Sequence, residues 1–285
     1  MNIKPLPRRN KDAYKGNCGR LLVIAGSKSM PGAGALVCRS AMRSGAGLVT
    51  WAVGESLNSF AAILDIETVR LIVPQTIDFA PSIQAREHLL EASAEKDVTV
   101  MGSGLPVTGE TGELMRLLTP ELHGTLVLDA GGLVAVGVEN ILLKKRKTPT
   151  ILTPHIGEMA ALTGLSISEI RLNRKEVAEE YAKKTNTILV LKGSESVVTN
   201  GTDTHINTTG NPGMATAGMG DVLCGIIAAL CGQKMDPFDA AVLAVYLHGL
   251  AGDIAIRDLG MHSLIATDMQ TYIPKAFQHH EKECT

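Results

Sequence analysis

Residues 20–53, RLLVIAGSKSMPGAGALVCRSAMRSGAGLVTWAV, decide the class of the fold. The apolar run Arg20–Ala25 has the length of a buried strand, and Gly26–Pro31 follows it as a loop. Gly32–Ser44 is rich in small and apolar residues and predicts a helix, and Leu48–Val53 predicts a second buried strand. A helix between two apolar strands is typical of a βαβ unit, in which the two strands lie parallel.

The same alternation continues along the chain. Further strands are expected at Val69–Val73, Val98–Met101, Thr125–Leu128, Thr150–Leu152 and Thr187–Leu191. Helices are expected at Gln84–Lys96, Glu110–Leu118, Ser168–Lys184, Asp221–Cys231, Pro237–Arg257 and Thr267–Phe277. Val197–Thr199 and Thr204–Asn207 flank the turn Asn200-Gly201-Thr202 and predict a hairpin. Since no linker or repeat interrupts this pattern, we expect one α/β domain with a mainly parallel sheet.

The composition argues against several classes of protein. The chain has 285 residues, with 27 Lys and Arg against 29 Asp and Glu, a balance that a nucleic-acid-binding protein would not show. It has neither a run of about 18 apolar residues to span a membrane nor the apolar segment of a signal peptide. The five cysteines, Cys18, Cys38, Cys224, Cys231 and Cys284, form no C-x-x-C motif and fit a reducing compartment. We therefore expect a cytoplasmic protein with neither a nucleic-acid nor a membrane partner.

Two common nucleotide-binding motifs are absent. The sequence contains no GxxxxGK[ST], which argues against a P-loop nucleotidase. Gly32-Ala33-Gly34 follows a strand as in a dinucleotide-binding site, but Val37 stands where GxGxxG requires its third glycine. A Rossmann dinucleotide site is therefore not expected.

The segment NTTGNPGMATAGMGDVLCG, residues 207–225, carries the strongest signal for chemistry. Gly218 and Gly220 precede an apolar helix, and a small-residue loop entering a helix exposes backbone N–H groups that stabilise an anion such as a transferring phosphoryl group. Asp221 would lie beside this anion site, where a carboxylate can accept the proton of a hydroxyl that attacks phosphorus. The alternative is that Asp221 is an ordinary acidic residue in the first turn of a helix.

Other predicted strands also end in polar or glycine-rich segments, at the edge where parallel sheets bind ligands. In Thr153–Glu158, His155 is a candidate hydrogen-bond partner of a substrate and Glu158 a candidate ligand of hydrated Mg²⁺, although the spacing alone favours loop and first-turn roles for both. Lys192 is a candidate phosphate ligand, and Gly104 and Asp129 end two further strands. The basic run at residues 144–147 is expected to be a solvated loop or helix end.

Together these segments resemble the NAD(P)H-hydrate dehydratases, nucleotide-dependent repair enzymes of the ribokinase-like superfamily. The matching segments are YKG (14–16), LLVIAGS (21–27), PGAGAL (31–36), MRSGAGLV (42–49), GSGLP (102–106), LDAGGL (128–133), ILTPHIGEMAALTG (151–164), VLKG (190–193), NTTGNPGMATAGMGDVLCGIIAAL (207–230), AVYLHGLAGD (244–253) and LIATDM (264–269). The resemblance implies an α/β, ribokinase-like fold whose central, mainly parallel sheet is flanked by helices on both faces.

The resemblance also implies an activity. The enzyme would use an adenine nucleotide, with Mg²⁺, to phosphorylate the ring hydroxyl of hydrated NADH or NADPH; phosphate would then leave and the ring double bond return. The compact chain favours ADP, giving AMP and phosphate, with ATP as the alternative. Because aromatic residues make up only 3% of the chain, we expect the bases to be held by backbone, aliphatic and polar contacts.

The family's site residues carry over onto matching positions of this sequence. Asp221 corresponds to the general base and contacts the substrate. The contacts to the hydrated dinucleotide are Ala33, Gly104, His155 and Asp221. The contacts to the AMP part are Lys192, Gly193, Ser194, Glu195, Ser196 and Gly220. The anion site comprises Ala217, Gly218, Met219 and Gly220, and the residues in supporting roles are Glu158, Asn207, Asn211 and Asp129.

The sequence departs from the family pattern at four of these motif positions. Ala217 and Met219 replace a Gly and the Thr of GGTGD, Ile156 replaces the Pro of TPHPGE, and Ser103 replaces the Pro of GPGLP. The backbone N–H groups of the anion site remain, so the site is expected to persist without the threonine hydroxyl.

Many relatives carry an N-terminal epimerase domain, but here the match begins near residue 14, so we expect residues 1–285 to form a stand-alone dehydratase. The family also suggests a homo-oligomer, a tetramer, in which the helix at Ala240–Ile256 packs internally or at an interface. One alternative is a small-molecule kinase of the same superfamily, acting on a sugar or vitamin-precursor hydroxyl. Another is a nucleotide-binding sensor with a degenerate site.

Overall fold

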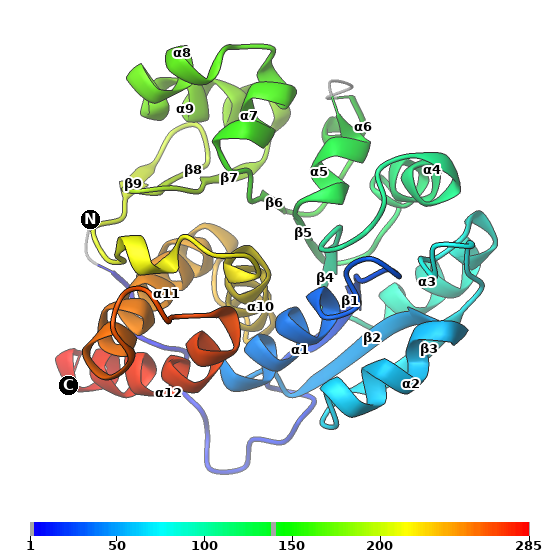
Figure 1. Cartoon of the computed structure of the whole chain (residues 1–285), viewed down its shortest axis with the longest axis horizontal. Helices are drawn as coiled ribbons and strands as arrows, with labels where there is room; N and C mark the ends of the chain where they lie inside the picture. Colours follow the sequence, from blue (N-terminus) through cyan, green and yellow to red (C-terminus); the bar gives the residue numbers. More distant parts are fainter. Residues whose placement is uncertain (1–2, 138–140, 285) are drawn as a thin grey trace.

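A nine-stranded sheet forms the centre of the described part of the chain, residues 3–137 and 141–284 of a computed structural model (Figure 1). The strands are β1 (Arg20–Ile24), β2 (Leu48–Gly54), β3 (Val69–Val73), β4 (Val98–Met101), β5 (Thr125–Leu128), β6 (Thr150–Leu152), β7 (Ile188–Leu191), β8 (Val197–Thr199) and β9 (Thr204–Ile206). Their order is β3-β2-β1-β4-β5-β6-β7-β8-β9. All neighbours from β3 to β7 pair parallel, whereas β8 and β9 pair antiparallel. The predicted mainly parallel sheet and its hairpin are confirmed.

Helices cover both faces of the sheet (Figure 1). The first face is covered by α1 (Ala33–Arg43), α2 (Glu55–Leu64), α10 (Met219–Gly232), α11 (Pro237–Leu259) and α12 (Ala266–Glu283). The second is covered by α3 (Arg86–Ala94), α4 (Gly109–Leu118), α5 (Gly131–Val136), α6 (Ile141–Lys144), α7 (Ile156–Thr163), α8 (Ile167–Leu172) and α9 (Arg174–Thr185). Short 3-10 turns lie at Ile83–Ala85 and Pro212–Met214.

Burial on both faces explains why the central strands are apolar at nearly every position. In β1, Leu21 and Val23 pack into the core of the first face, and Leu22 and Ile24 pack into the core of the second. All four side chains are at most 1% exposed. A strand buried on one face alone would alternate apolar and polar residues, so the continuous apolar run is a consequence of the helices on both sides.

Several helices differ from the sequence prediction. The segment predicted as one helix, Ser168–Lys184, forms two, α8 and α9, because Asn173 between them has φ −130° and ψ 43°. The predicted last helix continues to Glu283 instead of ending at Phe277. The spacing of apolar residues in the sequence did not predict α2, α5, α6 or α7. The last three have 6, 4 and 8 residues, too few to display a helical period, and α2 exposes Phe60 and Ile63 on its outer side, which obscures its period.

The basic run at residues 144–147 is not fully solvated, and the expectation is wrong for Arg146. Its side chain is buried and donates hydrogen bonds to the carbonyls of Thr119, Leu122 and Gly124, at 2.7, 3.0 and 2.9 Å. Burial lowers the pKa of Arg146 to about 10. Its guanidinium therefore joins the chain after α4 to the start of β6, a long-range role that a run of like charges does not reveal.

Helix α11 packs internally. Ala240, Ala241, Leu243, Ala244 and Leu247 are at most 1% exposed. By length and composition α11 is the one helix in the described ranges that meets the requirements for crossing a membrane, but 67% of its most apolar window is buried against the rest of the fold. Its apolar character therefore fits a core helix.

The strand order creates a ligand-binding edge. From β1 the chain winds outward through β2 to β3, and then β4 returns to the other side of β1. The loops that leave the carboxyl ends of β1 and β4 consequently turn toward opposite faces, and α/β sheets bind ligands at such a point. The two loops touch there, because the Gly26 N–H donates to the Ser103 carbonyl at 2.9 Å.

Candidate active site

Polar side chains from four adjacent strand ends converge on the carboxylate of Asp129. Thr153 donates to Asp129 Oδ1 at 2.7 Å, and Ser103 donates to Oδ2 at 3.2 Å. The ammonium of Lys192 lies 2.8 Å from Oδ1. Asp129 and Lys192 follow β5 and β7, and Ser103 and Thr153 follow β4 and β6. The sequence predicted Asp129 and Lys192 at one edge of the sheet, and the structure brings them into direct contact.

The charges and hydrogen bonds in this cluster favour the ionised forms of both Asp129 and Lys192. Burial raises the pKa of Asp129, but the charge of Lys192 and the hydrogen bonds from Lys192, Thr153 and Ser103 outweigh it, so the net pKa is lowered. Burial lowers the pKa of Lys192, but negative neighbours led by Asp129 outweigh it, and its net pKa is raised. The pair is therefore a fixed carboxylate and a fixed cation at the edge of a cavity.

The predicted anion-site residues lie at the amino end of α10. Gly218 caps the helix in the left-handed region, with φ +88°, which glycine adopts without strain. The first N–H groups of a helix have no partner within the helix and carry the positive end of its dipole. A Cβ at Gly220 would lie 3.1 Å from Lys192 Nζ, so the absent side chain leaves the ammonium beside these N–H groups.

Asp221 lies in the first turn of α10 and interacts with Asp129, Ser103 and Lys192 of this cluster. Burial, followed by the negative charge of Asp129, raises the pKa of Asp221 to about 7, whereas a hydrogen bond from Ser103 and the charge of Lys192 oppose the rise. An ordinary first-turn acid has its pKa lowered by the helix dipole. A carboxyl group that titrates near pH 7 is suited to accept a proton in a reaction at neutral pH.

His155 and Glu158 begin helix α7 as a capping box. His155 Nδ1 accepts from the backbone N–H groups of Gly157 and Glu158 at 3.0 and 3.1 Å, and the Glu158 carboxylate accepts from the His155 N–H at 2.7 Å. The loop and first-turn roles that the spacing favours are therefore confirmed. Both side chains also border the cluster, since Glu158 lies 3.9 Å from Lys192 and the His155 side chain is 58% exposed.

A cavity of about 560 Å³ opens beside this cluster. The predicted site residues that line it are the nucleotide contacts Lys192, Gly193, Ser194, Glu195, Ser196 and Gly220, the anion-site residue Met219, and the supporting residues Asn207 and Asn211. Its described lining includes no Phe, Tyr or Trp, as the low aromatic content predicts. Of the predicted site residues, those outside this lining are Ala33, Gly104, Asp129, His155, Glu158, Ala217, Gly218 and Asp221.

Asn207 and Asn211 hold the cavity wall in place. The Asn207 amide donates to the Thr209 carbonyl and accepts from the Thr209 hydroxyl, at 2.8 and 3.1 Å. Asn211 accepts from the Gly213 N–H and donates to Asp253, at 3.0 and 2.9 Å. Both side chains thus bind the loop backbone, and Asn211 also ties the loop to Asp253 on α11.

Ala33 and Gly104 meet where the loops after β1 and β4 touch. Gly104 has φ +67°, and a Cβ at this position would lie 2.6 Å from the Cβ of Ala33. Since Ser103 precedes Gly104 and hydrogen-bonds Asp129, this contact is linked to the Asp129 cluster. Asp221 adjoins both groups of candidate contacts: its neighbour Gly220 lines the cavity, and Ser103, with which it interacts, precedes Gly104.

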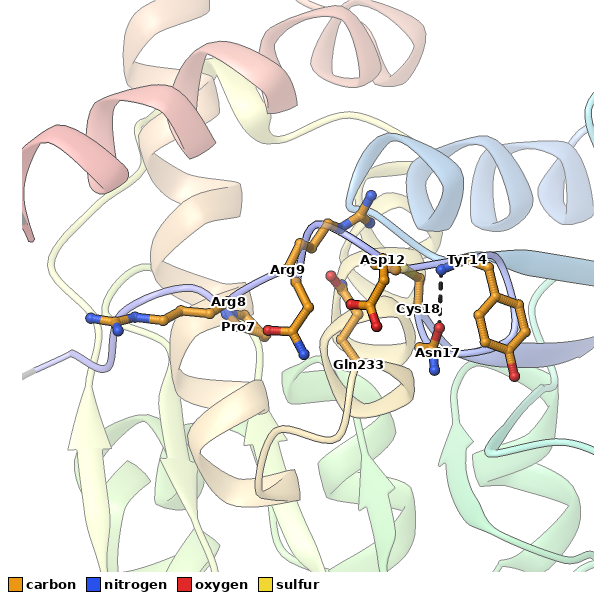
Figure 2. A pocket seen from close by; sticks show the side chains of 10 residues that line it. Pro7, Arg8, Arg9, Asp12, Tyr14, Asn17, Cys18 and Gln233 are labelled. Carbon is orange, nitrogen blue, oxygen red and sulfur yellow. Dashed lines mark hydrogen bonds between the residues drawn. The ribbon is translucent and has the colours of Figure 1, made fainter.

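A second hollow, of about 260 Å³, lies at the opposite end of α10, beneath the N-terminal segment (Figure 2). Figure 2 shows Arg8 and Arg9 pointing in different directions, and Arg9 donates to the Gly45 carbonyl. The cations do not converge on a common point. We therefore place the chemistry in the larger cavity beside Asp221.

Three contributors were not singled out from the sequence. Thr153 binds Asp129, Asp253 anchors the loop that carries Asn211, and His248 lines the cavity from α11. The segment AVYLHGLAGD contains the last two, but apolar residues around them hide their polar function. Only the packing of α11 against the cavity reveals it.

Comparisons with known structures define the class of the fold. A ribokinase-like superfamily protein from Enterococcus faecalis superposes with a TM-score of 0.83 at 24% identity, covering 96% of this chain and 92% of its own. The crystal structure of an ADP/ATP-dependent NAD(P)H-hydrate dehydratase from Bacillus subtilis, co-crystallized with ATP/Mg²⁺, superposes with a TM-score of 0.83 at 31% identity, covering 97% and 95%. The fold is ribokinase-like, as predicted.

Sequence comparisons identify the family. The family model described as NAD(P)H-hydrate dehydratase matches residues 21–275. The bifunctional NAD(P)H-hydrate repair enzyme of Moorella thermoacetica is 41% identical over 98% of this chain and 53% of its own length. The ADP-dependent (S)-NAD(P)H-hydrate dehydratase of Bacillus subtilis is 33% identical over 97% of this chain and 95% of its own. The chain belongs to the NAD(P)H-hydrate dehydratase family, although it spans only about half the length of the bifunctional relatives that it matches.

Proposed function

We propose that this protein is a lyase of metabolite repair, which dehydrates hydrated NADH and NADPH to the reduced coenzymes and consumes ADP. The observation that carries the proposal is the position of Asp221. This carboxyl group, with a pKa of about 7, lies at the amino end of a helix, directly after Gly220 of the nucleotide-sized cavity, and interacts with Ser103, the residue before Gly104. Family membership supports the substrate class, since the Bacillus subtilis relative is an ADP-dependent dehydratase.

The first step is a phosphoryl transfer. Asp221 accepts the proton of the substrate's ring hydroxyl as that oxygen attacks the terminal phosphorus of ADP. The bond between this phosphorus and the bridging oxygen breaks, and AMP leaves with the electron pair. The N–H groups at the start of α10 and the ammonium of Lys192 stabilise the negative charge on the transferring group.

The second step is an elimination. The bond between the ring carbon and the phosphate oxygen breaks, and phosphate leaves with the electron pair. The neighbouring ring carbon loses a proton, and the ring double bond forms. Phosphate is a far better leaving group than hydroxide, so the transfer makes the dehydration feasible. We assign Lys192–Ser196 and Gly220 to the AMP part, and Ala33, Gly104 and His155 to the hydrated dinucleotide.

We propose that Mg²⁺ accompanies the nucleotide. Within residues 3–137 and 141–284, no group of three or more His, Cys, Asp or Glu side chains is placed to hold a metal alone. Mg²⁺ commonly binds through one or two carboxylates together with substrate phosphates, and Glu158 is available in that role at the cluster's edge. The ion would neutralise phosphate charge. The Bacillus subtilis crystal structure, obtained with ATP/Mg²⁺, supports this assignment.

The test is to incubate the purified protein with hydrated NADH and Mg²⁺, with ADP and ATP in parallel. We expect the absorbance of the reduced nicotinamide ring to return and inorganic phosphate to appear in equal amount, faster with ADP. A stable phosphoester without restored absorbance would indicate a small-molecule kinase instead. Nucleotide binding with no turnover would indicate a sensor.

We also propose a cytoplasmic homo-oligomer, a tetramer. Support comes from exposed apolar side chains on α2 and the edge strand β3, where Phe60, Ile63, Val69 and Ile72 are 45% to 80% exposed. An edge strand and an apolar patch are both prone to pair with another chain. The five cysteines are free thiols, which fits a reducing compartment. Light scattering coupled to gel filtration measures the assembly, and a monomer at micromolar concentration would contradict it.

A further inference from the structure

Residues 207–215, the cavity loop, form one wall of the larger cavity and lie against helix α11. All of these residues except Gly213 line the cavity. The loop follows β9 and contains one short 3-10 turn, Pro212–Met214, so no strand or long helix fixes its path. The shape of the cavity therefore depends on the contacts that hold this loop from outside.

The carboxylate of Asp253 on α11 makes two of these contacts. Its Oδ2 accepts from the backbone N–H of Gly210, and its Oδ1 accepts from the side-chain amide of Asn211, both at 2.9 Å. Asn211 Oδ1 in turn accepts from the Gly213 N–H at 3.0 Å. Because a carboxylate can only accept, the amide nitrogen of Asn211 must face Asp253. One carboxylate thus holds both the backbone and a side chain of the loop.

The same face of α11 fits the loop by shape. The Thr209 hydroxyl donates to the Tyr246 carbonyl at 2.9 Å. A Cβ at Gly249 would lie 2.3 Å from Thr209 Oγ1 and 2.6 Å from the carbonyl carbon of Thr209, so the loop backbone lies directly on the helix. Tyr246, Gly249 and Asp253 are spaced three and four positions apart, which places them on one face of the helix. The loop therefore has a defined seat on α11.

We propose that Asp253 is a positioning residue that keeps the cavity loop on this seat before the nucleotide arrives, and that it thereby sets the affinity for the nucleotide. The inference rests on the proposed function in one respect, that the cavity takes the adenine nucleotide. Asp253 is outside the described lining of the cavity and acts through Gly210 and Asn211. Apparent affinity falls in proportion to the fraction of molecules whose binding site is formed. Saturating nucleotide restores the seated loop, so the chemical step is spared.

The first test compares D253A with D258A. Asp258 is a matched control, because it lies on the same helix and its carboxylate accepts from Tyr272 and Lys275 at 2.7 and 3.1 Å, both on α12. Calorimetric titration measures the Kd of ADP, and steady-state kinetics with hydrated NADH separate KM for ADP from kcat. We expect D253A to raise Kd and KM for ADP by roughly tenfold or more, the effect of losing a hydrogen bond to a charged group, with kcat little changed. D258A should match the wild type.

The second test exchanges the two partners. D253N leaves the amide of Asn211 facing another amide, and N211D leaves the carboxylate of Asp253 facing another carboxylate, so each variant should weaken ADP binding. In the double variant N211D/D253N an amide again faces a carboxylate, and the N–H groups of Gly210 and Gly213 each keep an acceptor. The double variant should therefore bind ADP more tightly than either single variant. Losses that simply add would overturn the proposal.

Hydrogen exchange on the wild type covers the case that D253A fails to fold. The peptide spanning residues 207–215 should exchange slowly without nucleotide; rapid exchange that slows only with ADP would show that the loop is not held beforehand. An unchanged Kd in D253A, or a loss in kcat as large as the rise in KM, would also overturn the role of Asp253. If the wild type binds no ADP, the proposed function falls together with this inference. If the binding pattern holds but hydrated NADH is not converted, only the proposed function falls.

Discussion

Replacing Asp221 with Asn distinguishes a catalytic base from an ordinary helix acid, because the two roles predict opposite changes in stability. The pKa of Asp221 is raised from 3.8 to about 7 by burial and then by the charge of Asp129. A group whose pKa rises on folding stabilises the folded state below its unfolded pKa, and this contribution is lost as the pH rises through the folded pKa. The wild type therefore bears the cost of a buried charge above pH 7, and the Asp221→Asn variant does not.

The size of the effect follows from the pKa. A rise from 3.8 to about 7 corresponds to about 4 kcal/mol at pH 8, an upper limit that solvent screening of this half-buried group reduces to about 1–3 kcal/mol. In a protein of this size each kcal/mol moves Tm by roughly 2–4 °C. We expect the variant to melt several degrees above the wild type at pH 8 and to match it near pH 4. Turnover should fall by roughly 10²–10⁴, with ADP affinity retained.

Differential scanning calorimetry from pH 4 to pH 9 measures the stability difference, with Asp12→Asn as the control. Asp12 is exposed, at the far end of α10 from Asp221. A variant of Asp221 that melts below the wild type at pH 8 would show that the helix dipole stabilises an ordinary acid there. Near-normal turnover of hydrated NADH by the same variant would refute the general-base role directly.

Three further substitutions test the cluster and the fold. Ser103→Ala removes a hydrogen bond that lowers the pKa of Asp221, so the pKa of Asp221 should rise. In a pH–rate profile, turnover should then reach half of its maximum at a higher pH than in the wild type. Lys192→Met leaves the buried carboxylate of Asp129 without its cation and should cost about 3–5 kcal/mol in urea unfolding, while the double variant with Asp129→Asn recovers part of the loss. Arg146→Met leaves three backbone carbonyls without their donor and should cost at least about 3 kcal/mol in the same assay; a loss below about 1 kcal/mol would contradict its bracing role.

The sequence predicts the strands better than the helices, and burial explains the difference. Strands Val69–Val73, Val98–Met101, Thr125–Leu128 and Thr150–Leu152 have the bounds that their apolar runs predict. Such runs are visible because helices cover both faces of the sheet. Several helices are too short to display a helical period, and α10 is apolar at nearly every position, so no period marks it. The break at Asn173 depends on the backbone conformation of a single residue, which no window average detects.

The candidate site was predictable where function depends on local sequence, and not where it depends on strand order. Gly218, Gly220 and Asp221 form the start of one helix, and the small-residue segment around them predicts an anion site there. The contact of Lys192 with Asp129 requires β5, β6 and β7 to be neighbours. The apolar pattern of the sequence predicts strands but does not predict which strands are neighbours in the sheet. Arg146 illustrates the same limit, because its partners lie more than 20 residues away in sequence.

Two of the departures from the family motif, Met219 and Ser103, lie beside the Asp129 cluster or the cavity. Met219, in place of Thr, has its side chain buried at 6% exposure, where it packs into the core and borders the cavity. The N–H groups at the start of α10 do not depend on that side chain, so the anion site persists. Ser103, in place of Pro, adds a hydroxyl that bonds Asp129 and opposes the rise in the pKa of Asp221. In this chain a hydroxyl from the end of β4 therefore acts on the acid at the start of α10.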